Sequence, residues 1–234
     1  MNGAALLEVQ LVDNQLDQLA GEKRRLPERA ALAAAHAATA EWTAEQARLR
    51  SVIATASEEI AEAEREGSAL DTKRARLEAQ LKTVSTERQA DALSHEIETI
   101  KHHHSDLDDR ELAAMEAQGD AEAGLIALDG RHPKLEAALG SARSELEAAL
   151  ARIAGEEAAL AERRSVADAS LSDDERATYA SLRMRFGGMG IVQLEGRRCT
   201  GCHLDLSATE ADQVHHAPAD ELPGCPHCGR LIVR

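Results

Sequence analysis

A heptad pattern of apolar residues is the feature that most restricts the fold of this chain. The pattern covers residues 49–84 with alternating spacings of four and three residues, and Gly67 and Arg74 interrupt it. Side chains at this spacing form one stripe along a helix, so the stripe must pack against another helix. Shorter stripes cover residues 93–107 and 128–153. The pattern predicts a coiled coil rather than a globular helical bundle.

Composition supports an elongated molecule. Aromatic residues make up 1% of the chain, while hydrophobic residues reach 43% and charged residues 29%. Globular cores are partly filled by rings, because each ring buries a large area. Apolar content made of Ala, Leu, Ile and Val, in a background of Glu, Arg and Gln, is typical of long helices and coiled coils.

The stripes break near residues 82–89, where the chain is expected to reverse. Thr86, followed three residues later by Gln89, fits a capping box that starts a new helix. We therefore expect two antiparallel helices, near residues 5–83 and 87–167. Pro27 and Pro133 should each kink or break their helix, since proline lacks a backbone donor and clashes with the preceding turn. The predicted fold class is mainly α, a long antiparallel coiled-coil hairpin with a small C-terminal β zinc ribbon.

The pattern changes after residue 170. Ser172 with Glu175, and Ser207 with Glu210, are further capping boxes. The expected elements are helices over 173–184 and 208–215 and strands over 191–197 and 230–233. We predict two domains, the hairpin of residues 1–170, with its turn near 82–89, and a unit of residues 171–234 that holds a short helix and the zinc ribbon.

The four cysteines form two C-x-x-C pairs separated by 22 residues: Cys199 and Cys202, then Cys225 and Cys228. Two such knuckles supply a tetrahedral shell of four thiolates, which predicts one structural Zn²⁺. A unit this small has too little core to fold unaided, so the metal must contribute folding energy. Four protein ligands leave no coordination position for a reactive water.

Three other kinds of site share parts of this sequence. Cys199 to His203 matches the attachment string of c-type haem, but that attachment follows export. Cys225-Pro-His-Cys228 resembles the active site of thiol oxidants, but no βαβ pattern surrounds it. His102 to His104 point about 100° apart on a helix and cannot converge on one ion.

Location follows from two further observations. No run of about 18 apolar residues exists that could span a membrane. Residues 1–20 carry Glu8, Asp13 and Asp17 and lack the basic region of a signal peptide. We expect a cytoplasmic protein without membrane contact, in a reducing compartment where cysteines bind metal rather than form disulfides.

The net charge of −15 is carried entirely by the first 182 residues, because residues 183–234 contain six arginines and six acids. A rod this acidic repels phosphate backbones, so nucleic acid could bind only at the ribbon. The candidate partner-binding or nucleic-acid-binding residues are Arg183, Arg185, Arg197, Arg198 and Arg230. These arginines either pair with acids of the rod on a solvated surface or form a patch for phosphate or a partner.

Several segments follow a known pattern: residues 7–27 near the start, Arg88, His95 and Glu96 near the hairpin turn, residues 105–116 beyond it, and the closing Cys225-Pro-x-Cys-Gly-Arg230. In these segments the chain resembles a bacterial family of coiled-coil proteins with a C-terminal C4-type zinc ribbon. Its Ala- and Arg-rich composition suggests an actinobacterial, and within that group a mycobacterial, member. It departs from the family pattern at Thr86 and Ala90 and at residues 221–224, which make a poor strand.

The resemblance implies a hairpin with a ribbon at its base and no catalytic activity, and two functions stay open. The first is an adaptor whose ribbon binds an unidentified protein partner, with the rod as spacer and docking surface. The alternative is binding of RNA or DNA through the ribbon and its arginines. No Ser/His/Asp, phosphate-loop or open-metal pattern indicates an enzyme. The sequence does not decide the oligomeric state.

Overall fold

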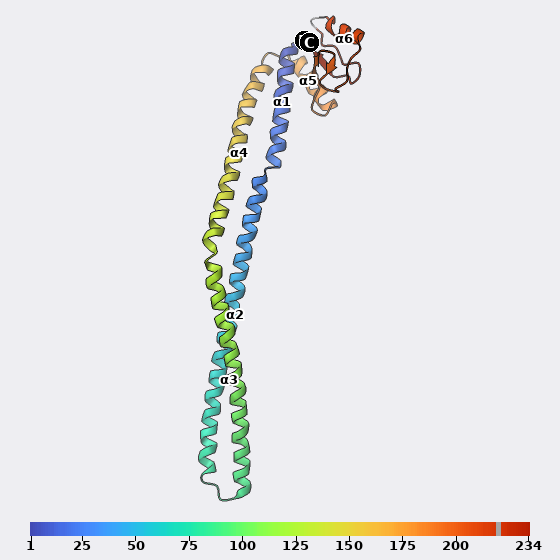
Figure 1. The fold of residues 1–234 in the computed structure, drawn as a ribbon. Coiled ribbons are helices and arrows are strands. Elements are labelled where there is room, and N and C mark those ends of the chain that lie inside the picture. Colours follow the sequence, from blue (N-terminus) through green and yellow to red (C-terminus); the bar gives the residue numbers. More distant parts are fainter. Residues whose placement is uncertain (219–220) are drawn as a thin grey trace. The chain divides into compact units, whose positions relative to one another are not determined.

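The computed structural model describes residues 1–218 and 221–234 (Figure 1). The helices are α1 (Gly3–Arg24), α2 (Pro27–Leu81), α3 (Glu87–Asp129), α4 (His132–Asp168), α5 (Asp173–Arg185) and α6 (Ala208–His215). The strands are β1 (Ile191–Glu195), β2 (Arg198–Cys199) and β3 (Leu231–Val233). Two compact units result, Leu32–Ala142 and the combination of Met1–Ala31 with Arg143–Arg234. The predicted mainly α class, with long helical hairpins and a small C-terminal sheet, is confirmed.

Both prolines mark breaks between helices, as predicted. Helix α1 ends at Arg24 and α2 begins at Pro27 itself. Helix α3 ends at Asp129, and Pro133 is the second residue of α4. Proline is tolerated in a first helical turn because the backbone N–H groups there have no partner within the helix.

The predicted stripes supply the core of the unit formed by residues 32–142. Near the hairpin turn, Leu77 of α2 packs with Ile97 and Ile100 of α3, where the two helices lie side by side (Figure 1). Gly67, an interruption in the stripe, faces His104, since a Cβ there would lie 3.7 Å from His104 Nε2. The glycine therefore lies beside a half-buried ring of the facing helix, at a distance that is ordinary van der Waals contact.

Farther along the same unit, Leu49 packs with Ala121 and Leu128. The single tryptophan, Trp42, donates a 3.0 Å hydrogen bond from its indole nitrogen to the Leu128 carbonyl. Its ring lies 4.3 Å from that of His132, between centroids. The Leu128 carbonyl is in the last turn of α3 and also accepts from Arg131 N–H at 3.0 Å, so Trp42 adds a side-chain donor at this helix end.

The capping box predicted at Thr86 is wrong. Thr86 precedes α3, but its hydroxyl donates to Gln89 Oε1 at 2.8 Å and makes no bond to the helix backbone. The two side chains pair with each other and so leave the backbone donors of the first turn to solvent. Ser172 before α5 and Ser207 before α6 do form both bonds of the motif with the glutamate three residues on.

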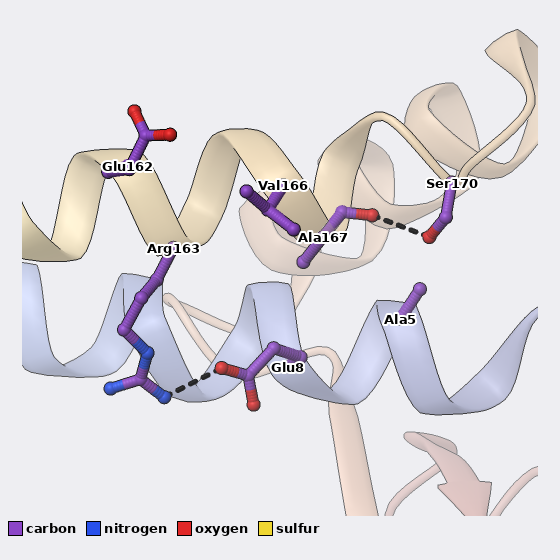
Figure 2. A pocket seen from close by; sticks show the side chains of 7 residues that line it. All are labelled: Ala5, Glu8, Glu162, Arg163, Val166, Ala167 and Ser170. Atoms are coloured by element: carbon purple, nitrogen blue, oxygen red, sulfur yellow. Dashed lines mark hydrogen bonds and ion pairs between the residues drawn. The ribbon is translucent and has the colours of Figure 1, made fainter.

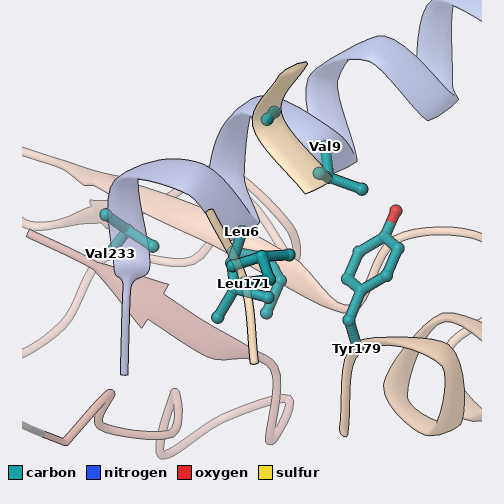
Figure 3. Close-up of a cluster of buried hydrophobic side chains, with 7 residues drawn as sticks. Leu6, Val9, Leu171, Tyr179 and Val233 are labelled. Carbon is teal, nitrogen blue, oxygen red and sulfur yellow. The ribbon is translucent and has the colours of Figure 1, made fainter. Parts of the chain in front are cut away.

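In the other unit, the N-terminal helix α1 covers the small sheet. The sheet order is β2-β1-β3, with β1 antiparallel to β2 and parallel to β3. Buried side chains from α1, α5, β3 and the segment between α4 and α5 meet in one cluster, including Leu6, Val9, Leu171, Tyr179 and Val233 (Figure 3). The weak strand at 221–224 contributes only an isolated bridge, between Gly224 and Leu231.

Among the helices of residues 1–218 and 221–234, none combines the length and apolar character needed to cross a lipid bilayer.

Candidate metal centre

The four cysteines converge beside the sheet. Cys199 ends β2, and Cys202, Cys225 and Cys228 lie in turns of the chain. All four sulfur atoms lie within 4.8 Å of one another, and Cys202 Sγ is 3.9 Å from Cys225 Sγ. Tetrahedral zinc with Zn–S bonds of about 2.3 Å requires sulfur atoms about 3.8 Å apart. The sulfur positions therefore fit one zinc ion.

The two knuckles use the same backbone turn. His203 N–H donates to the Cys199 carbonyl at 2.9 Å, and Gly229 N–H donates to the Cys225 carbonyl at 2.8 Å. Both residues have positive φ, 61° at His203 and 76° at Gly229. Glycine adopts this conformation at no steric cost, whereas His203 is the one non-glycine residue with positive φ in the described part of the chain.

The environment of the thiols differs from one cysteine to the next. Burial raises the pKa of Cys202 and raises that of Cys225 to about 12. At Cys228 burial opposes ionisation, but hydrogen bonds from the backbone N–H and side chain of Arg230 bring the pKa down to about 7. Cys202 and Cys225 therefore ionise only with help from a cation, and metal binding releases protons.

Two of the five candidate arginines are committed to the fold. Arg183 donates to the Gly188 carbonyl at 2.9 Å and to Asp17 Oδ2 at 2.6 Å. Arg230 donates from Nε to the Met189 carbonyl at 2.8 Å. Both guanidinium groups thus already have partners within the fold.

The other three candidates are exposed. Arg197 lies in the turn between β1 and β2, and Arg198 begins β2. Arg185 ends α5, with its guanidinium 5.2 Å from the centroid of the Phe186 ring. Three of the five predicted arginines are therefore exposed, and the binding role of all five stays a prediction.

The residues predicted near the hairpin turn belong to the unit of residues 32–142. Glu96 forms a 2.8 Å ion pair with Lys73 of the facing helix α2. Arg88 and His95 are exposed on α3. The neighbouring histidines give no metal cluster, because the four cysteines are the only such group among the described residues.

Two buried polar residues of α1 hold the ribbon, and sequence reasoning gave neither a role. Gln10 is 1% exposed, and its amide bonds the backbone of Gly188, Gly190 and Ile191. Asp13 is 7% exposed and joins α1 to α4 and α5. Both residues occupy core-facing positions of an amphipathic helix, and this spacing could have marked them as buried. Their bonding partners lie more than 150 residues away, so spacing could not identify those partners.

A groove of about 520 Å³ lies between α1 and α4, in the same unit as the metal centre (Figure 2). Its apolar lining is Ala5, Val166 and Ala167, and Arg163 pairs with Glu8 at 2.6 Å. Its one hydroxyl, on Ser170, donates to the Ala167 carbonyl at 2.8 Å and so caps the end of α4.

Comparison with known proteins gives matches along the chain. The family model of the CT398-like coiled coil hairpin domain matches residues 9–187, and that of the C4-type zinc ribbon domain matches residues 198–232. A protein of Mycobacterium tuberculosis is 27% identical over 231 residues, which cover 98% of this chain and 94% of that protein.

Solved structures show the same fold. A structure from Mycobacterium smegmatis has a TM-score of 0.80 at 24% identity, covering 100% of this chain and 99% of the other. CT398 from Chlamydia trachomatis has a TM-score of 0.79 at 21% identity, covering 98% and 97%. Together with the sulfur geometry, the ribbon match confirms the predicted cofactor, one zinc ion held by four cysteines.

Proposed function

Because the chain belongs to the CT398-like coiled-coil hairpin family and ends in a C4-type zinc ribbon, we propose that it is a non-catalytic adaptor whose ribbon binds a partner protein. The observation that carries the proposal is the exposed loop of the first knuckle. Leu204 is 52% exposed there, and it lies two residues after the zinc ligand Cys202. Arg197 and Arg198 lie beside this loop, because the Cys199 N–H bonds the Leu204 carbonyl and Leu206 N–H bonds that of Arg197.

A loop of this kind is suited to recognition. The metal fixes its backbone, so little conformational entropy is lost when a partner binds. A leucine that loses its hydration next to arginines gives an apolar contact with a charged rim, which is the usual composition of a protein interface.

The absence of catalysis is part of the same proposal. Four thiolates complete the zinc shell, and a closed shell leaves no position at which water could be activated. The groove between α1 and α4 offers one hydroxyl, and that hydroxyl is bound to a backbone carbonyl.

Affinity capture from a native cell extract tests the adaptor. The bait is the full chain, compared with Leu204→Ser and with Leu112→Ser as a matched control, since Leu112 is 59% exposed on α3 in the other unit. We expect one set of proteins to be captured by the wild type and by Leu112→Ser, and to fall at least tenfold with Leu204→Ser. Equal capture by all three baits would rule out the ribbon loop as the docking surface.

Nucleic-acid binding through the ribbon is the alternative, and the exposure of Arg185, Arg197 and Arg198 favours it. Three phosphate contacts on a single strand give a slope of about −2 for log affinity against log salt. RNA and DNA binding should be measured across salt with the wild type and with Arg197→Ala plus Arg198→Ala. An unchanged slope in the double variant would argue against phosphate contacts, and nuclease treatment of the capture experiment separates the two functions directly.

A further inference from the structure

Arg230 contacts both the metal centre and the turn that seats helix α1. Its backbone carbonyl accepts a 2.8 Å hydrogen bond from the N–H of Cys225, a zinc ligand. Its Nε donates to the Met189 carbonyl at 2.8 Å. The guanidinium carbon lies 5.1 Å from the centroid of the Phe186 ring. One residue thus joins the second knuckle to the segment between α5 and β1.

The first knuckle is shaped around the same side chain. A Cβ on Gly201 would lie 2.8 Å from Arg230 Cδ and 2.6 Å from Val192 Cγ1. Real Cβ atoms do not approach other atoms so closely, so the glycine leaves the space that the arginine occupies. Arg230 therefore passes over the first knuckle while it bonds the second.

On its other side, the Met189 segment is held by α1. Gln10 Nε2 donates to the Gly188 carbonyl at 2.7 Å, and Gln10 Oε1 accepts from Gly190 N–H at 2.8 Å. The glycine turn, residues 187–190, thus lies between Gln10 and Arg230. Gln10 and Arg230 can both keep these hydrogen bonds only while the turn keeps its conformation.

We propose that Arg230 is a positioning residue that links zinc binding to the seating of helix α1 on the ribbon. The bound metal fixes both knuckles, and with them Arg230, whose carbonyl is bonded by Cys225 N–H and whose Cδ packs over Gly201. Arg230 in turn fixes the Met189 carbonyl of the glycine turn. Because coupling between two binding events is reciprocal, a seated α1 also strengthens the hold on the metal.

Arg230→Gln is the test variant, and Arg185→Gln is its matched control. Arg185 lies 5.2 Å from the centroid of the same Phe186 ring but ends α5 rather than a zinc knuckle. The loss of a residue that supports a metal ligand costs about 10–100-fold in metal affinity. We expect zinc transfer from the full chain to a chromophoric chelator to be faster by that factor in Arg230→Gln and unchanged in Arg185→Gln.

Alkylation of the zinc-loaded protein separates a positioning role from a purely structural one. Without the bond from Arg230 to the Met189 carbonyl, the knuckle that holds Cys225 and Cys228 loosens, and its thiolates become more accessible to the reagent. Mass spectrometry should therefore find a selective increase in alkylation at Cys225 and Cys228 in Arg230→Gln, with Arg230→Lys restoring part of the protection. An equal increase at all four cysteines would mean that Arg230 only holds the fold, and would overturn the proposal.

Hydrogen exchange tests the coupling. In the wild type, removal of zinc should speed exchange in residues 187–190 and in α1, and zinc-loaded Arg230→Gln should show part of the same increase. Gln10→Ala should in turn speed zinc release by reciprocity. If exchange in α1 is the same with and without zinc, or if Gln10→Ala releases zinc at the wild-type rate, the linkage does not exist. None of these measurements involves a partner, so their failure is distinct from failure of the adaptor function.

Discussion

The hydroxyl of Tyr179 donates a 2.6 Å hydrogen bond to Oδ2 of Asp13, which joins helix α5 to helix α1. Arg164 of α4 donates from Nε to the other carboxylate oxygen at 2.7 Å. Burial, followed by the bond to Asp13, raises the pKa of Tyr179 above its usual range. The phenol therefore stays protonated at neutral pH and acts as the donor, and three helices share one buried carboxylate.

Asp13→Ala should destabilise the unit of residues 1–31 and 143–234 by about 2–3 kcal/mol, because the substitution removes the acceptor of a buried hydroxyl and the shorter of the two ion pairs of Arg164. Native-state hydrogen exchange of α1 and α5 measures this loss. Asp17→Ala is the control. Asp17 pairs with Arg183 at 2.6 Å but has a side chain that is 62% exposed, so its loss should cost less than about 1 kcal/mol. Equal losses for the two variants would mean that the burial of Asp13 has no energetic consequence.

The features that sequence predicted well depend on local periodicity. The stripes that predicted the hairpin reappear as core contacts, such as that of Leu77 with Ile97, because a repeat of 3.5 residues fixes which helix face is apolar. The cysteine spacing predicted the zinc ligands for a similar reason, since each knuckle is a short turn. The division into residues 1–170 and 171–234 stays a prediction.

The features that the sequence did not predict depend on which of several possible groups a side chain hydrogen-bonds. Spacing allowed a capping box at Thr86, but the hydroxyl bonds the Gln89 side chain instead. Charge alone grouped Arg183 and Arg230 with three exposed arginines, although both bond the glycine turn. No local pattern distinguishes an arginine that binds a backbone carbonyl far along the chain from one in solvent.

Two glycine-to-alanine substitutions should have opposite effects. Gly201→Ala places a Cβ 2.6 Å from Val192 Cγ1, and we expect it to speed zinc release and to destabilise the ribbon by about 1–3 kcal/mol. Gly155→Ala adds a methyl group to α4 with no atom within 4 Å, so it should stabilise the protein by about 0.5–1 kcal/mol. Thermal unfolding with a zinc-release assay compares the two. A Gly201→Ala protein with normal zinc retention would contradict the close packing over the first knuckle.

His104 should make the stability of the unit of residues 32–142 depend on pH. A hydrogen bond to Asp108, 3.2 Å from Nδ1, raises its pKa despite partial burial, and Asp71 of α2 adds a smaller attraction. A raised folded-state pKa means that protonation stabilises the fold. The contribution is therefore complete below the unfolded pKa of about 6.5 and disappears as pH rises through the folded value.

An NMR titration of the His104 ring measures this shift, and Asp108→Asn should reduce it because the largest cause is removed. Denaturation of the wild type at mildly acidic and mildly alkaline pH should show the greater stability at the acidic end. In His104→Gln that difference should become smaller. A His104 pKa at or below that of a free histidine would contradict the arrangement.

Zinc removal should unfold the ribbon and leave helices α2 and α3 formed. The ribbon core is small, and its central members Leu206 and Ile232 are packed with two of the zinc ligands, Cys199 and Cys225. A core of this size does not offset the entropy of an ordered chain without the metal. The clusters of α2 with α3 contain no zinc ligand, so they should survive chelation. Hydrogen exchange should therefore become fast across residues 198–232 and stay slow around Ile97, while far-UV circular dichroism changes little.

Cys199→Ser plus Cys202→Ser should give the same pattern before chelator is added. Protected ribbon amides without zinc would show that the small core suffices, and simultaneous melting of α2 and α3 would show that the metal also supports the hairpin.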